Sequence, residues 1–153
     1  MIEIIPPRSI KDIRDIVYLY NNVGYDEYFT YDLEKAIYKT ELMWKMGSFI
    51  RLYIEDNEIL GFIIADIVDL IHLKDCVYKQ LWYASRCKGF KAAKVVKKLH
   101  EALIEEAENK KVGLVLSTGS HLDEDNTFTK LLERFGWLRH GHTAFWKTKY
   151  YKE

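Results

Sequence analysis

One predicted helix begins with a cluster of cations, which is the opposite of the charge order that an isolated helix prefers. The segment Arg86-Cys87-Lys88-Gly89-Phe90-Lys91 leads from a strand pattern into a helix pattern over about residues 90–109. The cations are Arg86, Lys88, Lys91, Lys94, Lys97 and Lys98. The glutamates come later, at Glu101, Glu105, Glu106 and Glu108. Since a helix N-terminus already carries about half a positive charge and unpaired N–H groups, the segment predicts an anion site.

Two histidines and two cysteines are further residues whose spacing could suggest chemistry. His140 and His142 are two residues apart, so on the strand predicted over residues 140–150 they share one face. Their spacing specifies no third metal ligand, and a polar strand face explains the pair as well. Cys76 and Cys87 form no CxxC pair, so we expect thiols that pack or lie exposed without chemistry.

Composition favours one folded domain over residues 1–153, because 48% of the chain is hydrophobic and 30% is charged. The 23 basic and 23 acidic residues cancel, so no overall charge draws the chain to nucleic acid or to an anionic membrane. Residues 1–7 lack the pattern of a secretion signal, and no apolar stretch approaches the roughly 18 residues that span a bilayer. We therefore expect a cytoplasmic protein whose anion binding is local, with no membrane partner.

Hydrophobic periodicity predicts the elements that must position these residues. Strands are predicted over residues 3–5, 49–55, 59–69, 77–84, 112–116 and 140–150. Helices are predicted over residues 10–21, 33–43, 90–109 and 126–135. Ser9 and Asp32 are candidate caps of the first two helices, and Asp56-Asn57 is a candidate hairpin turn. The long helix before the strand 112–116 is the usual connection between parallel neighbours, so the sheet should be mostly antiparallel with one such crossover.

The segment from residue 86 to residue 91 resembles a motif of the GNAT acetyltransferase superfamily. That family carries a pyrophosphate loop of the form R/Q-x-x-G-x-G/A between its fourth strand and the next helix. Arg86 and Gly89 match two of its defined positions, and Lys91 stands at the third. Small residues in such a loop let backbone N–H groups approach a diphosphate. Lys91 could add a cation beside the phosphates, or it could obstruct them.

A second segment, from Asn126 to Trp137, is similar to the family's late helix. The Asn, Leu, Glu, basic, Gly and aromatic positions agree, at Asn126, Leu131, Glu133, Arg134, Gly136 and Trp137. In the family, this Asn contacts the pantetheine part of the coenzyme, and a Tyr often protonates the departing thiolate. Leu132 occupies that Tyr position here. The resemblance thus implies the fold and the coenzyme, with the usual general acid missing.

The resemblance spans nearly the whole chain. It implies an α+β fold of three layers, with a central twisted, mixed and mostly antiparallel sheet and helices on both faces. It also implies transfer of an acetyl group from acetyl-coenzyme A to an amine of a small molecule or a protein, with no metal. The implied coenzyme-binding residues are Leu81, Trp82, Tyr83, Arg86, Cys87, Lys88, Gly89, Phe90, Lys91, Asn126 and Lys130.

Catalytic roles also follow from the resemblance. In the family, a backbone N–H of the fourth strand polarises the thioester carbonyl, which corresponds to the region from Leu81 to Tyr83. Tyr83 is a candidate to replace the missing acid, and Asp66 is a candidate base. His121 titrates near neutral pH and is a candidate acid or base, although an ordinary loop histidine fits as well. Further carboxylates that could serve, or be plain surface groups, are Asp69, Asp123 and Asp125.

Other readings stay open. The aromatic segment of residues 25–31 falls where the family builds its acceptor lid, so it could stack on a planar acceptor or simply pack. Lys91 and Leu132 fit a catalytically diverged binding or structural protein with the same fold. An acyltransferase that modifies nucleic acid is disfavoured by the neutral charge and the lack of a second basic stripe. The sequence does not identify the acceptor amine. A homodimer is kept as one alternative for the partner.

Overall fold

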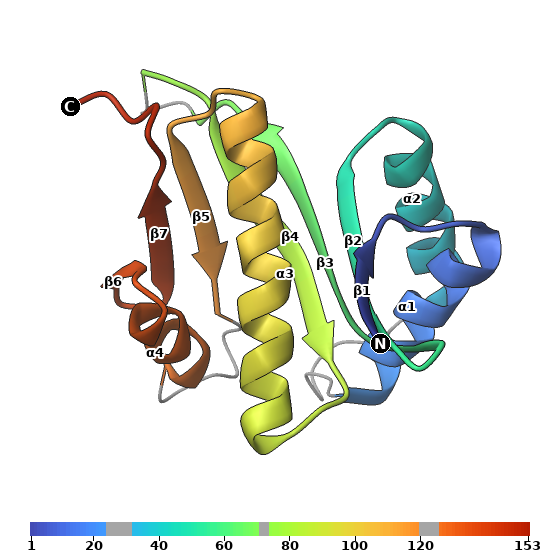
Figure 1. Cartoon of the computed structure of the whole chain (residues 1–153). Helices are drawn as coiled ribbons and strands as arrows, with labels where there is room; N and C mark the ends of the chain where they lie inside the picture. Colours follow the sequence, from blue (N-terminus) through green and yellow to red (C-terminus); the bar gives the residue numbers. More distant parts are fainter. Residues whose placement is uncertain (24–31, 71–73, 120–125) are drawn as a thin grey trace. The chain divides into compact units, whose positions relative to one another are not determined.

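The computed structural model describes residues 1–23, 32–70, 74–119 and 126–153 (Figure 1). Along the chain the elements are β1 (Ile2–Ile5), α1 (Ile10–Val23), α2 (Leu33–Lys45), β2 (Phe49–Glu55), β3 (Glu58–Val68), β4 (Val77–Ser85), α3 (Gly89–Asn109), β5 (Leu114–Thr118), α4 (Thr127–Arg134), β6 (Leu138–His140) and β7 (Thr143–Lys147). The strands form one seven-stranded sheet in the order β1-β2-β3-β4-β5-β7-β6. β4 and β5 are parallel, whereas β1–β2, β5–β7 and β6–β7 are antiparallel. The predicted mixed α+β sheet is confirmed.

The described residues divide into two compact units. The first comprises residues 1–64 and 82–99, and the second comprises residues 65–81 and 100–153. Two strands and one helix contribute to both units: β3, β4 and α3. The predicted anion-binding segment, residues 86–91, therefore lies in the first unit, and we call it the anion segment. The segment that begins at Asn126 lies in the second unit.

In the first unit, α1 packs its apolar stripe on alternate residues of β2 and β3. Ile13, Ile16 and Leu19 share a core with Ile50, Leu52, Ile54, Phe62 and Ile64. Trp82 joins this core, with its ring 5.5 Å from that of Phe62 and 4.5 Å from that of Tyr20. The hairpin turn is as predicted, since Asp56 and Asn57 both have positive φ, the conformation of a two-residue type I′ loop. Asp32 caps α2 by accepting a hydrogen bond from the Lys35 N–H, 3.0 Å away.

The other face of β3 lies against the first half of α3, and Gly61 allows that approach. A Cβ atom at residue 61 would stand 2.7 Å from Val95 Cγ1 and 2.9 Å from the Ala84 carbonyl oxygen. Residues 59–65 are all buried, as expected for a strand covered on both faces. The start of α3, and with it the anion segment, is thus held close to the sheet by a residue without a side chain.

We predict that Gly61→Ala lowers the free energy of unfolding by about 1–3 kcal/mol, the usual cost of overpacking a core. Urea denaturation measures it. In a Val95→Ala background one of the two close contacts is removed, so the same substitution should cost less there. Equal costs in the two backgrounds would contradict the packing explanation.

In the second unit, the later half of α3 ends in a turn that delays the start of β5. Val112 N–H bonds the Ala107 carbonyl and Lys111 N–H bonds the Glu108 carbonyl, with Lys111 at φ 57°, which is the Schellman pattern of a helix end. β5 accordingly begins at Leu114 and not at residue 112 as predicted. α4 ends in the same pattern at Gly136, where the sequence predicted its end.

The last strand predicted over residues 140–150 is present as β7, but it covers only Thr143–Lys147. The chain instead makes a hairpin of β6 and β7, whose turn contains Gly141 at φ 63°. His142 lies in this turn, where its carbonyl accepts a hydrogen bond from the Gly119 N–H. His140 ends β6 and pairs with Thr143, so the two histidines do not share a strand face. A glycine with left-handed backbone forms a turn where the sequence predicted continuous strand, so β7 begins at Thr143.

Candidate functional site

The anion segment starts as a short loop that hydrogen bonds hold at the end of the sheet. Arg86 N–H bonds the Leu60 carbonyl at 2.9 Å, and Cys87 N–H bonds Ser85 Oγ at 3.0 Å. α3 begins at Gly89, whose φ is 62°, and the space where its Cβ would stand is open. Phe90, the next residue, is 98% exposed. The loop thus presents the first N–H groups of α3 without side-chain cover at residue 89, which suits close approach of an anion.

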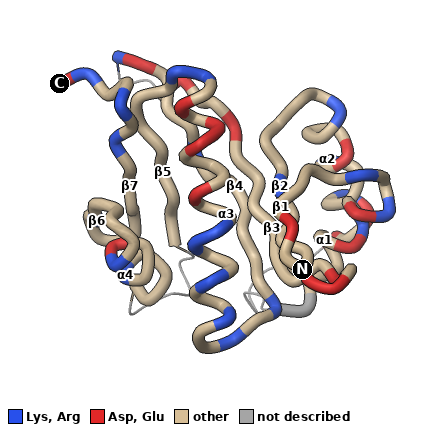
Figure 2. Tube along the Cα trace, viewed as in Figure 1, with Lys and Arg blue, Asp and Glu red and all other residues tan. Residues whose placement is uncertain are grey.

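Two cations of this segment already have carboxylate partners on the β2–β3 hairpin. Arg86 Nη1 lies 2.7 Å from Glu58 Oε1, and the Lys91 ammonium forms an ion pair with Glu55. The hydrogen bond to Glu55 is the main cause that raises the pKa of Lys91. Lys91 is therefore drawn to the end of β2. Figure 2 shows the cations of α3 on its first half and its carboxylates on the second, as the sequence indicates.

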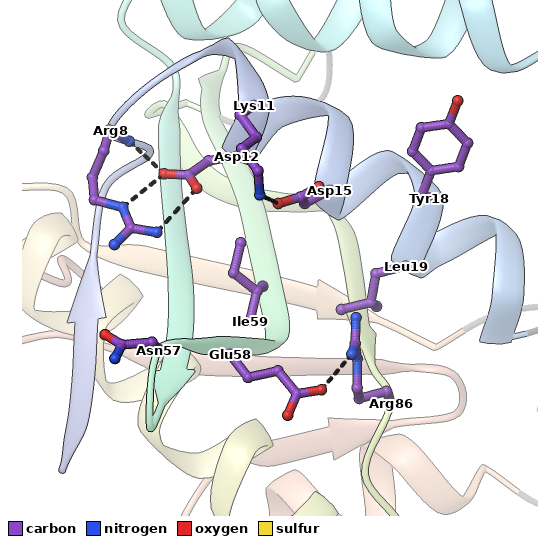
Figure 3. A pocket seen from close by; sticks show the side chains of 10 residues that line it. All are labelled: Arg8, Lys11, Asp12, Asp15, Tyr18, Leu19, Asn57, Glu58, Ile59 and Arg86. Carbon is purple, nitrogen blue, oxygen red and sulfur yellow. Dashed lines mark hydrogen bonds and ion pairs between the residues drawn. The ribbon is translucent and has the colours of Figure 1, made fainter.

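Arg86 also borders a pocket of about 330 Å³ between α1 and the β2–β3 hairpin (Figure 3). Each cation that lines it has a carboxylate partner: Arg8 with Asp12, Lys11 with Asp15, and Arg86 with Glu58. Asp12 is buried, and hydrogen bonds from Arg8 lower its pKa against the effect of burial. The pocket is thus charge-balanced. Of its cations, only Arg86 belongs to the loop that precedes α3.

Two tyrosines lie beside the loop in the first unit. Burial raises the pKa of the Tyr83 hydroxyl, against a smaller lowering effect of its hydrogen bond to Ser85. Burial, followed by the charge of Glu55, also raises the pKa of Tyr53. Both hydroxyls interact electrostatically with the Cys87 thiol. The structure therefore brings Tyr83 together with the loop, and adds Tyr53, which the sequence analysis missed.

Strand alternation could have found Tyr53. Residues 50, 52 and 54 of β2 face the α1 core, so residue 53 must face α3. Its hydroxyl is fully buried and makes no hydrogen bond to the described residues.

In the second unit, Asn126 directly precedes α4 with left-handed backbone at φ 55°. Its carbonyl accepts from the Lys130 N–H, but its side chain does not cap the helix. Asn126 Oδ1 is buried without a hydrogen-bond partner among the described residues, so this amide could accept a bond from a ligand. Lys130 is exposed, whereas Leu132 is 0% exposed and belongs to the core.

The remaining predicted residues are divided between the units or fall outside the description. Leu81 and Asp66 belong to the second unit, where Leu81 is exposed and Asp66 half-buried. Trp82 belongs to the first unit, where its ring is part of the core. His121, Asp123, Asp125 and the aromatic segment 25–31 lie outside the described residues. Three buried polar residues of the second unit that the sequence analysis missed, Gln80, His100 and Ser117, are hydrogen-bonded to one another.

The described residues contain neither a cluster of metal-ligating side chains nor a helix that could span a membrane. Among them, no three His, Cys, Asp or Glu side chains gather as metal ligands would. Every helix described is too short or too polar to cross a bilayer.

The sequence matches no protein-family model and no curated protein, but the fold is similar to solved structures. An N-acetyltransferase from Staphylococcus aureus Mu50 is 16% identical, with a TM-score of 0.72 over 96% of this chain and 98% of that one. A GNAT-family acetyltransferase from Desulfovibrio desulfuricans is 12% identical, with a TM-score of 0.73 over 96% and 99%. An acetyltransferase from Salmonella typhimurium, solved with its cofactor acetyl-CoA, is 13% identical, with a TM-score of 0.69 over 95% and 93%. The chain therefore has the GNAT fold that the sequence predicted.

Proposed function

We propose that this protein is an N-acetyltransferase, with residues 1–153 as one catalytic domain, which moves an acetyl group from acetyl-coenzyme A to an amine. The observation that carries the proposal is the loop before α3, where Gly89 opens the helix N-terminus directly after Arg86, Cys87 and Lys88. Its N–H groups and cations suit a diphosphate. The similar structure from Salmonella typhimurium, which was solved with acetyl-CoA as its cofactor, supports this choice of anion.

Groups on β4 and before α4 suit the remaining steps, which are attack by the amine and departure of the thiolate. The amine nitrogen attacks the thioester carbonyl, the carbon–sulfur bond breaks, and the departing thiolate takes a proton. Tyr83 would supply that proton from its hydroxyl, which is protonated at neutral pH as in any tyrosine; burial, which raises its pKa, favours the neutral form. A backbone N–H near Leu81 would polarise the carbonyl. The Asn126 amide oxygen, which has no hydrogen-bond partner among the described residues, would bind the pantetheine.

The amine must lose a proton before or during attack, and two residues are proposed for this step. His121 would titrate in the working range, and Asp66 on β3 would act directly or through water. Whether the amine belongs to a small molecule or to a protein is a matter for an acceptor screen. We expect the protein to work in the cytoplasm with no bound metal.

Calorimetric titration with acetyl-coenzyme A, followed by thiol release across a panel of amines, tests the function. Saturable binding and amine-dependent release of free thiol are the expected results. Lack of binding at millimolar coenzyme would refute the proposal.

Arg86→Ala should weaken coenzyme binding by about tenfold, because one charge-assisted contact to phosphate is worth roughly 1.5–3 kcal/mol. The unfolding free energy of the free protein should change by no more than about 0.5 kcal/mol, as expected for an exposed pair. Glu58→Gln should strengthen coenzyme binding, since it removes the carboxylate that pairs with Arg86. Lys11→Ala is the matched control, because Lys11 lines the same pocket in an equivalent pair with Asp15. A large loss of stability in Arg86→Ala would assign the residue a structural role.

A second candidate is a GNAT-fold protein that binds the coenzyme without turnover. The observation that favours it is the complete burial of Leu132, which leaves no acid at the family's usual position. Coenzyme binding without thiol release for any amine would support it over the enzyme.

A further inference from the structure

A chain of three buried polar side chains joins β4, α3 and β5 in the second unit. His100 Nε2 lies 3.0 Å from Ser117 Oγ, and Ser117 Oγ lies 3.0 Å from Gln80 Oε1. The same Gln80 oxygen accepts the Thr118 N–H at 3.2 Å. His100 is 1% exposed, Ser117 0% and Gln80 8%. Burying three polar side chains is costly unless their bonds are made, so this network fixes one arrangement of the elements that it joins.

The Thr118 N–H, the one backbone group in this network, determines which of the other groups donate and which accept. Thr118 N–H can only donate, so the Gln80 amide must turn its oxygen toward β5. That oxygen accepts the Ser117 hydroxyl proton, and Ser117 Oγ in turn accepts a proton from His100 Nε2. The direction of all three bonds is therefore determined.

The network lies where backbone pairing between β4 and β5 gives way to a side chain. Tyr78 pairs with Val115 and Lys79 with Leu116. At the next residue of β4, the Gln80 side chain reaches the Thr118 N–H. On its other edge, β5 stays paired with β7 as far as Thr118 and Thr143. The Gln80 side chain thus provides the acceptor for the Thr118 N–H of β5 beyond the last backbone pair with β4.

The other end of the network contacts α4. The His100 ring meets Phe128 and Trp137 edge-on, with ring centroids 5.5 Å apart in both pairs. Phe128 is two residues beyond Asn126, whose buried amide oxygen has no hydrogen-bond partner among the described residues. At the β4 end, Gln80 directly precedes Leu81. One network therefore supports two groups of the proposed site, the Leu81 backbone and the Asn126 amide.

We propose that Gln80, Ser117 and His100 are positioning residues for the acyl-pantetheine end of the coenzyme. They fix the positions of β4 and β5 through side-chain hydrogen bonds and keep Asn126 in place, and they touch neither the thioester nor the amine. This inference rests on the proposed acetyltransferase function. It predicts a defect confined to the part of the coenzyme that enters beside β5, while the phosphates at the start of α3 bind as before.

Calorimetry with two ligands tests the proposal: acetyl-coenzyme A, and adenosine 3′,5′-bisphosphate, which has phosphates but no pantetheine. Ser117→Ala and Gln80→Leu should each weaken the binding of acetyl-coenzyme A by about tenfold, which corresponds to roughly 1.4 kcal/mol. The affinity for the bisphosphate should stay within about twofold of that of the unmodified protein, well short of a tenfold change. Gln80→Glu keeps both hydrogen bonds that Gln80 Oε1 accepts, so unlike Gln80→Leu it should bind acetyl-coenzyme A as the unmodified protein does. In Gln80→Leu, hydrogen exchange at the Thr118 amide should accelerate.

Thr148→Val is the matched control, because it removes another buried hydrogen bond of the same unit, from Thr148 Oγ1 to the Val112 carbonyl. It should leave both affinities unchanged. If Gln80→Leu does not fold, Ser117→Ala decides alone. Equal weakening of both ligands, or unchanged binding of both, would refute the positioning role and leave the proposed function intact. If the unmodified protein binds no acetyl-coenzyme A, the proposed function fails first and this inference fails with it.

Discussion

Tyr83→Phe is expected to lower kcat by about 100-fold, at the lower end of what general acid catalysis contributes. The change removes only the hydroxyl and keeps the ring, so coenzyme affinity and folding should remain close to those of the unmodified enzyme. Steady-state kinetics with a responsive amine, together with calorimetry, measure the two quantities separately. A fall in affinity with kcat unchanged would assign Tyr83 to binding.

The pH dependence gives a second test of the same residue. Burial raises the pKa of Tyr83, so its hydroxyl stays protonated at pH values where an ordinary tyrosine, with a pKa of about 10, is ionised. An acid must be protonated to act, so kcat should not fall as the pH rises through 10, provided that the protein stays folded. A decline with a midpoint near 10 would contradict the proposed environment of Tyr83.

Tyr53→Phe is the matched control for Tyr83→Phe. Both tyrosines lie on strands of the first unit, and the pKa of each is raised by burial. The Tyr53 hydroxyl is buried without a hydrogen bond to the described residues, so its removal should leave stability unchanged or raise it by about 1 kcal/mol. Turnover should be unaffected. If Tyr53→Phe abolishes turnover and Tyr83→Phe does not, Tyr53 is the acid.

Gly89→Ala is expected to weaken coenzyme binding by about tenfold or more, corresponding to at least roughly 1.4 kcal/mol. The Cβ would project into space that is open in the free protein and that the phosphates would fill. Without ligand, the only cost should be left-handed backbone in a residue with a side chain, about 1–2 kcal/mol.

Gly47→Ala separates these two effects. Gly47 also has positive φ, 86°, and open space around its Cβ position, but it follows α2 and adjoins no proposed ligand. Its substitution should lower the free energy of unfolding by a similar amount and leave coenzyme affinity unchanged. Equal losses of affinity in both variants would show that backbone strain alone accounts for the result at Gly89.

Much of the fold could be predicted because local patterns determine it. The stripe of Ile13 and Ile16 marks α1, the cap at Asp32 marks the start of α2, and Asp56-Asn57 marks the hairpin. Errors occurred where backbone geometry overrides hydrophobic content. Left-handed Gly141 delays the last strand to Thr143, and left-handed Lys111 delays β5 to Leu114.

The site was predictable only in part, because spacing along the chain does not specify partners. The sequence marks Arg86, Gly89 and Lys91, but not that Glu58 and Glu55 already pair with the two cations. Nor does it reveal the network of Gln80, Ser117 and His100, since positions 80, 100 and 117 show no motif. These contacts join residues from different strands and helices, so their geometry exists only after folding.

The sequence by itself determined the charge reversal along α3, the loop before it and the order of elements, since each depends on neighbours in the chain. Only the tertiary structure decided which cations are neutralised, that Tyr83 has a raised pKa, that Leu132 belongs to the core, and that Gln80 takes over from the backbone between β4 and β5. The reason is physical: burial and hydrogen-bond partners are properties of packed surfaces, and packing brings together residues that the sequence keeps apart.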